Sequence, residues 1–154
     1  MNIFISYSTP DLKIVQELAN QLRVFGAVNY WGKSRIPGEV AWETIFKWID
    51  YSDFVIVLIT GNTVKRAMSV GQELARAKSK NKKIIPIISN QISIEELGFM
   101  SGITYQTIDV NQPQIAIEQL TNVIRTYHKN LKEKQNFAIG MVVIGFLIWS
   151  SRKQ

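Results

Sequence analysis

The chain has 154 residues, of which 46% are apolar and 19% charged, so it is long enough for one well-packed domain and too short for two ordinary ones. It contains no cysteine and one histidine, which excludes disulfide frameworks, thiol nucleophiles and multi-histidine metal sites. The net charge is +6, and the excess of Lys and Arg lies in residues 63–83 and 125–154. Nucleic-acid-binding proteins are often basic throughout, whereas this chain has two local basic patches. No nucleic-acid partner is therefore expected.

Short apolar runs alternate with helical patterns through residues 1–110. The runs predicted to be strands are Asn2–Tyr7, Ala27–Trp31, Phe54–Ile59, Ile84–Ile88 and Tyr105–Val110. Continuous apolar strands separated by helices favour a parallel sheet that is covered on both faces. Right-handed crossovers then predict an α/β fold with a doubly wound, flavodoxin-like sheet of five parallel strands. Pro86, inside the fourth run, is unusual for a central strand because it lacks a backbone N–H.

Helical spacing of apolar residues marks the segments between these runs. One predicted helix begins at Thr9 and ends at Gly26, a second is centred on residues 42–49, and the last spans residues 117–131. Ser69-x-x-Gln72 has the pattern of a capping box, which predicts a further helix starting at Ser69.

An uncharged apolar run, Phe137–Trp149, lies near the C-terminus between basic residues. It is shorter than the roughly 17–25 residues that span a bilayer, but flanking Lys and Arg can reach the surface of a thinned membrane. We therefore expect a globular domain over 1–128, a basic linker over 129–136 that continues the last helix, and a membrane-anchoring or transmembrane helix over 137–151. The charge bias predicts a single-pass protein with its domain in the cytoplasm. The alternatives are a core helix or a contact between subunits.

Polar segments follow the predicted strands at the edge where parallel sheets bind ligands. The chain has no glycine-rich dinucleotide motif and no P-loop motif, which disfavours dinucleotide redox chemistry and nucleotide triphosphate hydrolysis. The third strand ends at Ile59-Thr60 and lacks the aspartate of a CheY-like phosphoacceptor. Glu73 is the one acid within the basic stretch 63–83, and a carboxylate near a helix N-terminus stays ionised. Alternatively, Glu73 forms a surface ion pair with Arg76 or Lys80.

Hydroxyl and indole side chains are further candidates for binding a ligand. Ser6, Tyr7 and Ser8 follow the first strand and can donate to phosphate or ribose, or instead stabilise the turn. Trp31 and Trp42 can stack on a ligand ring, although Trp42 also fits a core-facing position of its helix.

Several segments, taken in order, resemble a Toll/interleukin-1 receptor (TIR) domain of the microbial type over about residues 1–130. They are IFISYS, RIPGEVAWETI, SDFVIVLIT and QELARAKSKNKKIIPII. The resemblance implies the flavodoxin-like fold, and it implies that residues 32–38 form the loop through which the family assembles. The residues matched to this assembly loop are Arg35, Ile36, Pro37 and Gly38.

The resemblance also implies an activity. Many members of the family cleave NAD at the nicotinamide–ribose bond, and their catalytic glutamate matches Glu73. The implied substrate-binding residues are Ser6, Tyr7, Ser8, Trp31, Lys33, Trp42 and Ser69. We therefore expect an NAD glycohydrolase or cyclase that is activated by self-association in defence or signalling. NAD is then the substrate, and neither a cofactor nor a metal is expected.

Three positions depart from the family pattern. Trp31 stands where the family often has aspartate, Ser69 where it often has an aromatic residue, and Ala67 where it usually has serine. These changes affect substrate geometry more than the fold. They support the alternative of a non-catalytic module that recruits other TIR proteins through residues 32–38.

Overall fold

The computed structural model describes residues 1–32, 40–64, 67–93, 97 and 104–151, with the backbone alone described for residues 64, 67 and 134–151. Within these ranges, five parallel strands form one sheet in the order β2-β1-β3-β4-β5. The strands are β1 (Asn2–Ser6), β2 (Ala27–Tyr30), β3 (Phe54–Ile59), β4 (Lys83–Ser89) and β5 (Gln106–Ile108). The predicted doubly wound fold and all five predicted strands are confirmed.

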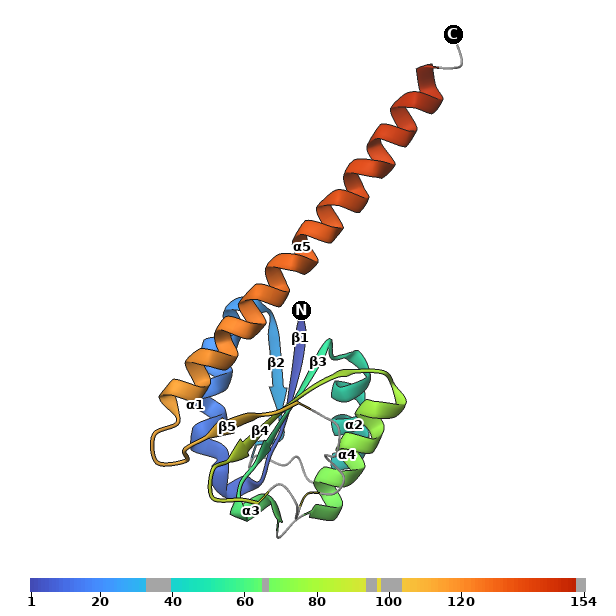
Figure 1. Cartoon of the computed structure of the whole chain (residues 1–154). Coiled ribbons are helices and arrows are strands. Elements are labelled where there is room, and N and C mark those ends of the chain that lie inside the picture. The colour runs from blue at the N-terminus through green and yellow to red at the C-terminus, as the bar shows by residue number, and fades with distance from the viewer. Residues whose placement is uncertain (33–39, 65–66, 94–96, 98–103, 152–154) are drawn as a thin grey trace.

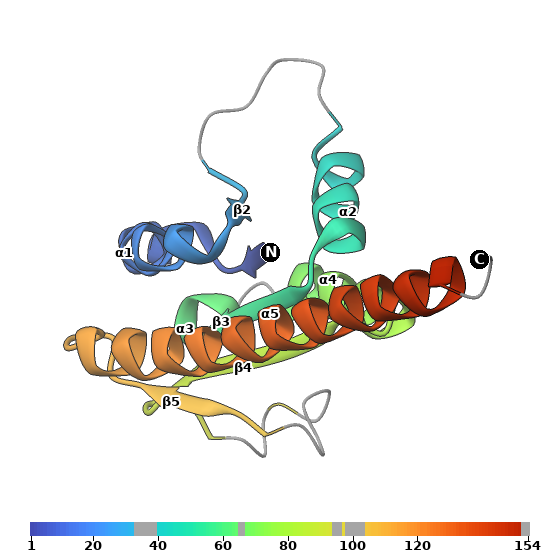
Figure 2. The same ribbon diagram turned by 90° about the horizontal axis from the view of Figure 1, so that it is seen from above.

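Helices cover both faces of the sheet. They are η1 (Thr9–Asp11), α1 (Leu12–Leu22), η2 (Arg23–Phe25), α2 (Ala41–Tyr51), α3 (Gly61–Val64), α4 (Ala67–Ser79) and α5 (Gln114–Ser151). α1 and the first part of α5 pack on one face, whereas α2 and α4 pack on the other (Figure 1). Seen from above, α1 lies to one side of β1 and β2, and α2 lies to the other (Figure 2).

Strand β3 shows why the sequence folds in this way. Ile56 and Leu58 pack in the apolar cluster under α1 and α5, while Val55 and Val57 pack in the cluster under α2 and α4. Every residue of β3 is buried, because successive side chains point to opposite faces and both faces are covered. The unbroken apolar run is therefore a consequence of the strand's central position.

Pro86 is compatible with its inner strand because of the register. It lies opposite Val57 of β3, and the pairing of β4 with β5 begins one residue later, at Ile87 opposite Gln106. On the side of β5, Pro86 therefore has no paired strand residue, which removes the objection to a proline in this strand.

Gly26 forms the turn into β2. Its φ of +151° lies in the region that favours glycine, and a Cβ atom there would lie 1.9 Å from the carbonyl oxygen of Met1. The neighbouring Ala27 N–H donates to the same oxygen at 3.0 Å. This close approach explains why the preceding helical segment ends at a glycine.

Helix α5 does not support a membrane anchor. It runs without a break from Gln114 to Ser151 and projects beyond the sheet at the edge where the N-terminus lies (Figure 1). Among the residues that the structure describes, no helix has the length and apolar character needed to cross a membrane. The predicted single-pass membrane localisation is therefore wrong, and a membrane segment is not found among the described residues, whereas the predicted helix over 137–151 as a separate segment stays a prediction.

The physical reason lies in the composition of α5. Its described side chains include exposed charged residues such as Glu118 and Lys129, and the uncharged run Phe137–Trp149 is shorter than the roughly 20 residues of a typical span. The division of the chain at residues 128 and 136 stays a prediction.

Candidate active site

Ser6 ends β1 on the face of the sheet that α2 and α4 cover. It lies opposite Val57 of β3, whose side chain belongs to the apolar cluster under these two helices. The Ser6 side chain is 1% exposed, and its Oγ has no hydrogen-bond partner among the described residues. Buried hydroxyls are nearly always paired, so this unpaired atom is a candidate for binding a ligand.

Tyr7 and Ser8 contact the protein backbone. The Tyr7 hydroxyl donates to the carbonyl oxygen of Trp31 at 2.6 Å and so joins the ends of β1 and β2. The buried Ser8 hydroxyl donates to the carbonyl oxygen of Asn62 at 3.2 Å. Both contacts stabilise the loops at the carboxyl edge of the sheet, which agrees with the alternative function that the sequence offered for these hydroxyls.

Glu73 lies on a half-buried strip of α4 together with Ser69 and Arg76. Their spacing of four and then three residues places the three side chains along one side of the helix. Arg76 forms an ion pair with Asp50 of α2. The strip that carries Glu73 is therefore the side of α4 next to α2.

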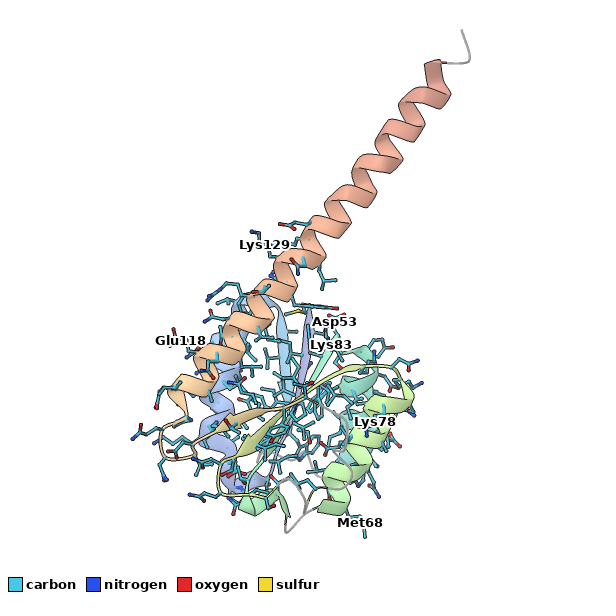
Figure 3. The ribbon with its side chains drawn as sticks, viewed as in Figure 1. Asp53, Met68, Lys78, Lys83, Glu118 and Lys129 are labelled. Atoms are coloured by element: carbon cyan, nitrogen blue, oxygen red, sulfur yellow. The ribbon has the colours of Figure 1, made fainter. Side chains whose placement is uncertain are left out.

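The start of α4 differs from the prediction. The described helix already includes Ala67, two residues before the expected N-cap at Ser69, so the capping-box interpretation is wrong. Glu73 still falls in the second turn. Met68, beside Ser69, is 80% exposed at the end of α4 that lies at the carboxyl edge, while Asp53 and Lys83 lie toward the opposite edge (Figure 3).

Helix α2 carries a matching half-buried strip of Trp42, Phe46 and Asp50. The Trp42 and Phe46 ring centres are 5.5 Å apart. The Arg76 guanidinium carbon lies 5.4 Å from the centre of the Phe46 ring, so Arg76 contacts two members of this strip.

The two strips lie level with each other because both helices run in the same direction. α2 and α4 each connect parallel strands, so both run from the carboxyl edge of the sheet to its amino edge. Phe46 on α2 and Glu73 on α4 each lie about one turn before the ion pair along their helices, so they are at about the same level. Trp42 and Ser69 each lie about two turns before it and are likewise at about the same level.

The ion pair between Asp50 and Arg76 has two hydrogen bonds. Arg76 Nε donates to Asp50 Oδ1 at 2.8 Å and Nη2 donates to Oδ2 at 2.5 Å. Through these bonds, and against a smaller opposing effect of burial, Arg76 holds the pKa of the Asp50 carboxyl below its usual value. The same bonds raise the pKa of Arg76. The sequence offered Arg76 as a partner of Glu73, but in the structure its guanidinium binds Asp50.

Trp31 belongs to the same side of the sheet as α2 and α4. Its half-buried ring lies 5.8 Å from that of Trp48, which in turn lies 6.3 Å from Phe4 of β1. Trp31 thus belongs to an aromatic group with Trp48 and Phe4, which is separate from the pair of Trp42 and Phe46.

The remaining predicted residues lie outside the described part of the chain. They are Lys33 and the assembly-loop residues Arg35, Ile36, Pro37 and Gly38. Within the described ranges, no group of three or more metal-ligating side chains occurs.

A polar cluster around Asp11 was not predicted from the sequence. This carboxylate is 7% exposed, and its oxygens accept hydrogen bonds from Thr60 Oγ1 at 2.6 Å and Asn62 Nδ2 at 2.9 Å. The cluster lines a pocket of about 320 Å³ beside the start of α1. Local sequence gave no signal for it, because Asp11 lies 49 residues before Thr60.

These features define a doubly wound α/β domain with a candidate site between two parallel helices at the carboxyl edge of the sheet. A family model described as "TIR domain" matches residues 3–121, and the chain belongs to the TIR domain family.

Solved structures support this fold. The chain is similar to the TIR domain of the Toll-related receptor TRR-2 from the lower metazoan Hydra magnipapillata, with a TM-score of 0.61, 21% identity and coverage of 80% of this chain and 97% of that one. It is also similar to the TIR domains of the activated Roq1 resistosome, which recognises the pathogen effector XopQ, with a TM-score of 0.61, 16% identity and coverage of 80% and 98%. At these identities the likeness shows the fold alone. The search of curated proteins gives no match.

Proposed function

We propose that this TIR domain cleaves NAD at the bond between nicotinamide and ribose, with Glu73 as the catalytic residue. Membership of a family that includes such enzymes supports the proposal. The observation that carries it is the half-buried position of Glu73 on α4, on the side of the sheet where the buried Ser6 hydroxyl has no hydrogen-bond partner among the described residues.

The chemistry requires only one carboxylate. Ordinary glycosidases use two, because one must protonate the leaving group. Nicotinamide leaves a cationic pyridinium as a neutral molecule and takes the bonding electron pair with it, so no acid is needed. The ribose C1′ becomes oxocarbenium-like, and an ionised Glu73 stabilises this charge while accepting hydrogen bonds from the ribose hydroxyls.

Either of two nucleophiles completes the reaction. Water adds to C1′ and loses a proton, which gives linear ADP-ribose. Attack by an adenine nitrogen of the same molecule gives a cyclic isomer instead. Trp31 and Trp42 stack on the rings of NAD, Ser6 and Ser69 donate to its ribose or phosphate oxygens, and Lys33 binds a phosphate.

We further propose that self-association activates the domain. The residues proposed for this contact are Arg35, Ile36, Pro37 and Gly38. Clustering raises the effective concentration of weakly interacting domains, so assembly does not require tight pairwise binding.

Nicotinamide release from the full chain, fused to a small oligomer so that the domains are clustered, tests this function. We expect release by the wild type and a loss of about 10²–10³-fold in Glu73→Gln. Glu118→Gln, which changes an exposed glutamate of α5 far from the site, is the matched control (Figure 3). Equal release by wild type and Glu73→Gln, or none from the clustered wild type, would contradict the proposal.

The second candidate is a non-catalytic module that recruits other TIR proteins. The departures at Trp31, Ala67 and Ser69 favour it. It predicts that Gly38→Asp abolishes pull-down of a TIR partner, while Glu73→Gln leaves both pull-down and signalling unchanged.

A further inference from the structure

We infer that Arg76 is a positioning residue for the site on α4, because it fixes the aromatic strip of α2 against the helix that carries Glu73. Asp50, Phe46 and Arg76 are the three groups involved. The inference about enzymatic effects rests on the function proposed above, whereas the inference about geometry does not.

Three contacts of one guanidinium restrict how α2 can lie. Two parallel hydrogen bonds bind the Asp50 carboxylate, at 2.8 and 2.5 Å. The same guanidinium lies over the Phe46 ring, one turn earlier on α2. Contacts to two successive turns restrain both the rotation of α2 about its axis and its sliding along α4.

Through a contact between two rings of α2, Arg76 also restrains a residue near the proposed substrate. Phe46 packs against Trp42, with ring centres 5.5 Å apart and planes inclined by 48°. Trp42 lies two turns from the ion pair, at the level of Ser69. A change at Arg76 therefore alters the orientation of the Trp42 indole, although Arg76 itself lies away from the carboxyl edge.

Arginine is required here, and lysine does not replace it. A planar guanidinium can donate two parallel hydrogen bonds to a carboxylate while its face lies on an aromatic ring. An ammonium group is a point charge that cannot make this combination of contacts. The ion pair also differs from the surface pair Lys129–Glu133 on α5, whose single contact is 3.9 Å long and mostly exposed.

The test compares wild type with two variants. Arg76→Lys keeps the charge and loses the guanidinium. The exchange Asp50→Arg/Arg76→Asp restores a bidentate pair, with the guanidinium on α2 and the carboxylate on α4. Arg125→Lys is the matched control, because Arg125 lies over the Phe25 ring at 6.0 Å on the other face of the sheet. The first readout is the indole N–H resonance of Trp42 in ¹⁵N-labelled full-length protein, assigned with Trp42→Phe. The second is KM and kcat for NAD with clustered protein.

We expect Arg76→Lys to stay folded, to shift the Trp42 resonance, and to raise KM about tenfold with kcat changed less than about threefold. The exchange returns both readouts toward wild type, and Arg125→Lys leaves both unchanged. A Trp42 resonance that is the same in wild type and Arg76→Lys would overturn the inference, as would an equal shift in Arg125→Lys. If the wild type does not cleave NAD, the proposed function fails while the resonance still decides the positioning.

Discussion

Two buried polar groups at the same edge of the sheet have opposite surroundings. Asp11, beside the start of α1, has a hydrogen-bond partner for each of its carboxylate oxygens. Ser6, on the side of α2 and α4, has no partner for its hydroxyl among the described residues. The first arrangement is typical of a group that stabilises the fold, and the second of a group kept for a ligand.

The rest of each region agrees with this difference. Around Asp11, hydroxyl and amide groups of Thr60 and Asn62 bind one another and fix the loop at the start of α3. On the other side, three half-buried residues occur: Trp31 follows β2, Trp42 lies in the first turn of α2, and Glu73 lies in the second turn of α4. The comparison shows that burial of a polar group does not by itself identify a site; whether its hydrogen bonds are satisfied is more informative.

The largest expected effect on stability is that of Asp11→Ala. Removing the carboxylate leaves Thr60 and Asn62 without their acceptor, which lowers the free energy of unfolding by about 2–4 kcal/mol. Urea denaturation measures this change, with the exposed Glu118→Ala on α5 as control. If Asp11→Ala keeps wild-type stability but loses NAD cleavage, the structural role of Asp11 is contradicted, because Asp11 would then belong to the site.

A matched pair of buried serines sharpens the comparison. The Ser52 hydroxyl donates to the carbonyl oxygen of Ile49 at 2.8 Å, so Ser52→Ala should lower the free energy of unfolding by about 1 kcal/mol. Ser6→Ala removes a hydroxyl that has no hydrogen-bond partner among the described residues, so it should change stability by less than about 0.5 kcal/mol while it weakens NAD cleavage. Equal destabilisation by the two substitutions would show that Ser6 has a partner and a structural function.

The smallest expected effect is the pH dependence at Asp50. Because Arg76 lowers the pKa of this carboxyl in the folded protein, the ion pair adds stability above the ordinary aspartate pKa of 3.8 and loses it as the pH falls through the folded pKa. The melting temperature of Asp50→Asn should therefore be lower than that of wild type at pH 7 and pH 5. At pH values below 3.8 the difference should shrink, and a difference that grows on acidification would contradict the assignment.

The fold could be predicted from sequence because its signals are local. The unbroken apolar run Phe54–Ile59 indicates a strand that is buried on both faces. Gly26 marks the end of the preceding helical segment, where the backbone has a positive φ. Strand β5 was predicted too long, with six residues in place of Gln106–Ile108, because an edge strand has little apolar pattern. The start of α4 was predicted two residues late, since Ser69 offered a cap in a place where the helix already continues.

The site was predictable only in part because it depends on contacts between distant residues. Glu73 stood out as a single acid in a basic stretch, but local spacing suggested Arg76 as its partner. In the structure the guanidinium of Arg76 binds Asp50, which lies 26 residues earlier on another helix. The apolar C-terminal run was interpreted from composition alone, and the described helix that leads into it does not meet the requirements of a membrane span.

Titration of ¹⁵N-labelled Glu73→Gln with NAD tests the central claim most directly, because this variant should bind NAD without cleaving it. The chain of 17.6 kDa is suited to such spectra. The account predicts that resonances of Ser6, Trp42 and Ser69 shift with NAD concentration while those of Asn62 and Gln91 do not. Shifts confined to Asn62 and Gln91, in the pocket beside Asp11, would place the ligand on the other side of the sheet and contradict the account.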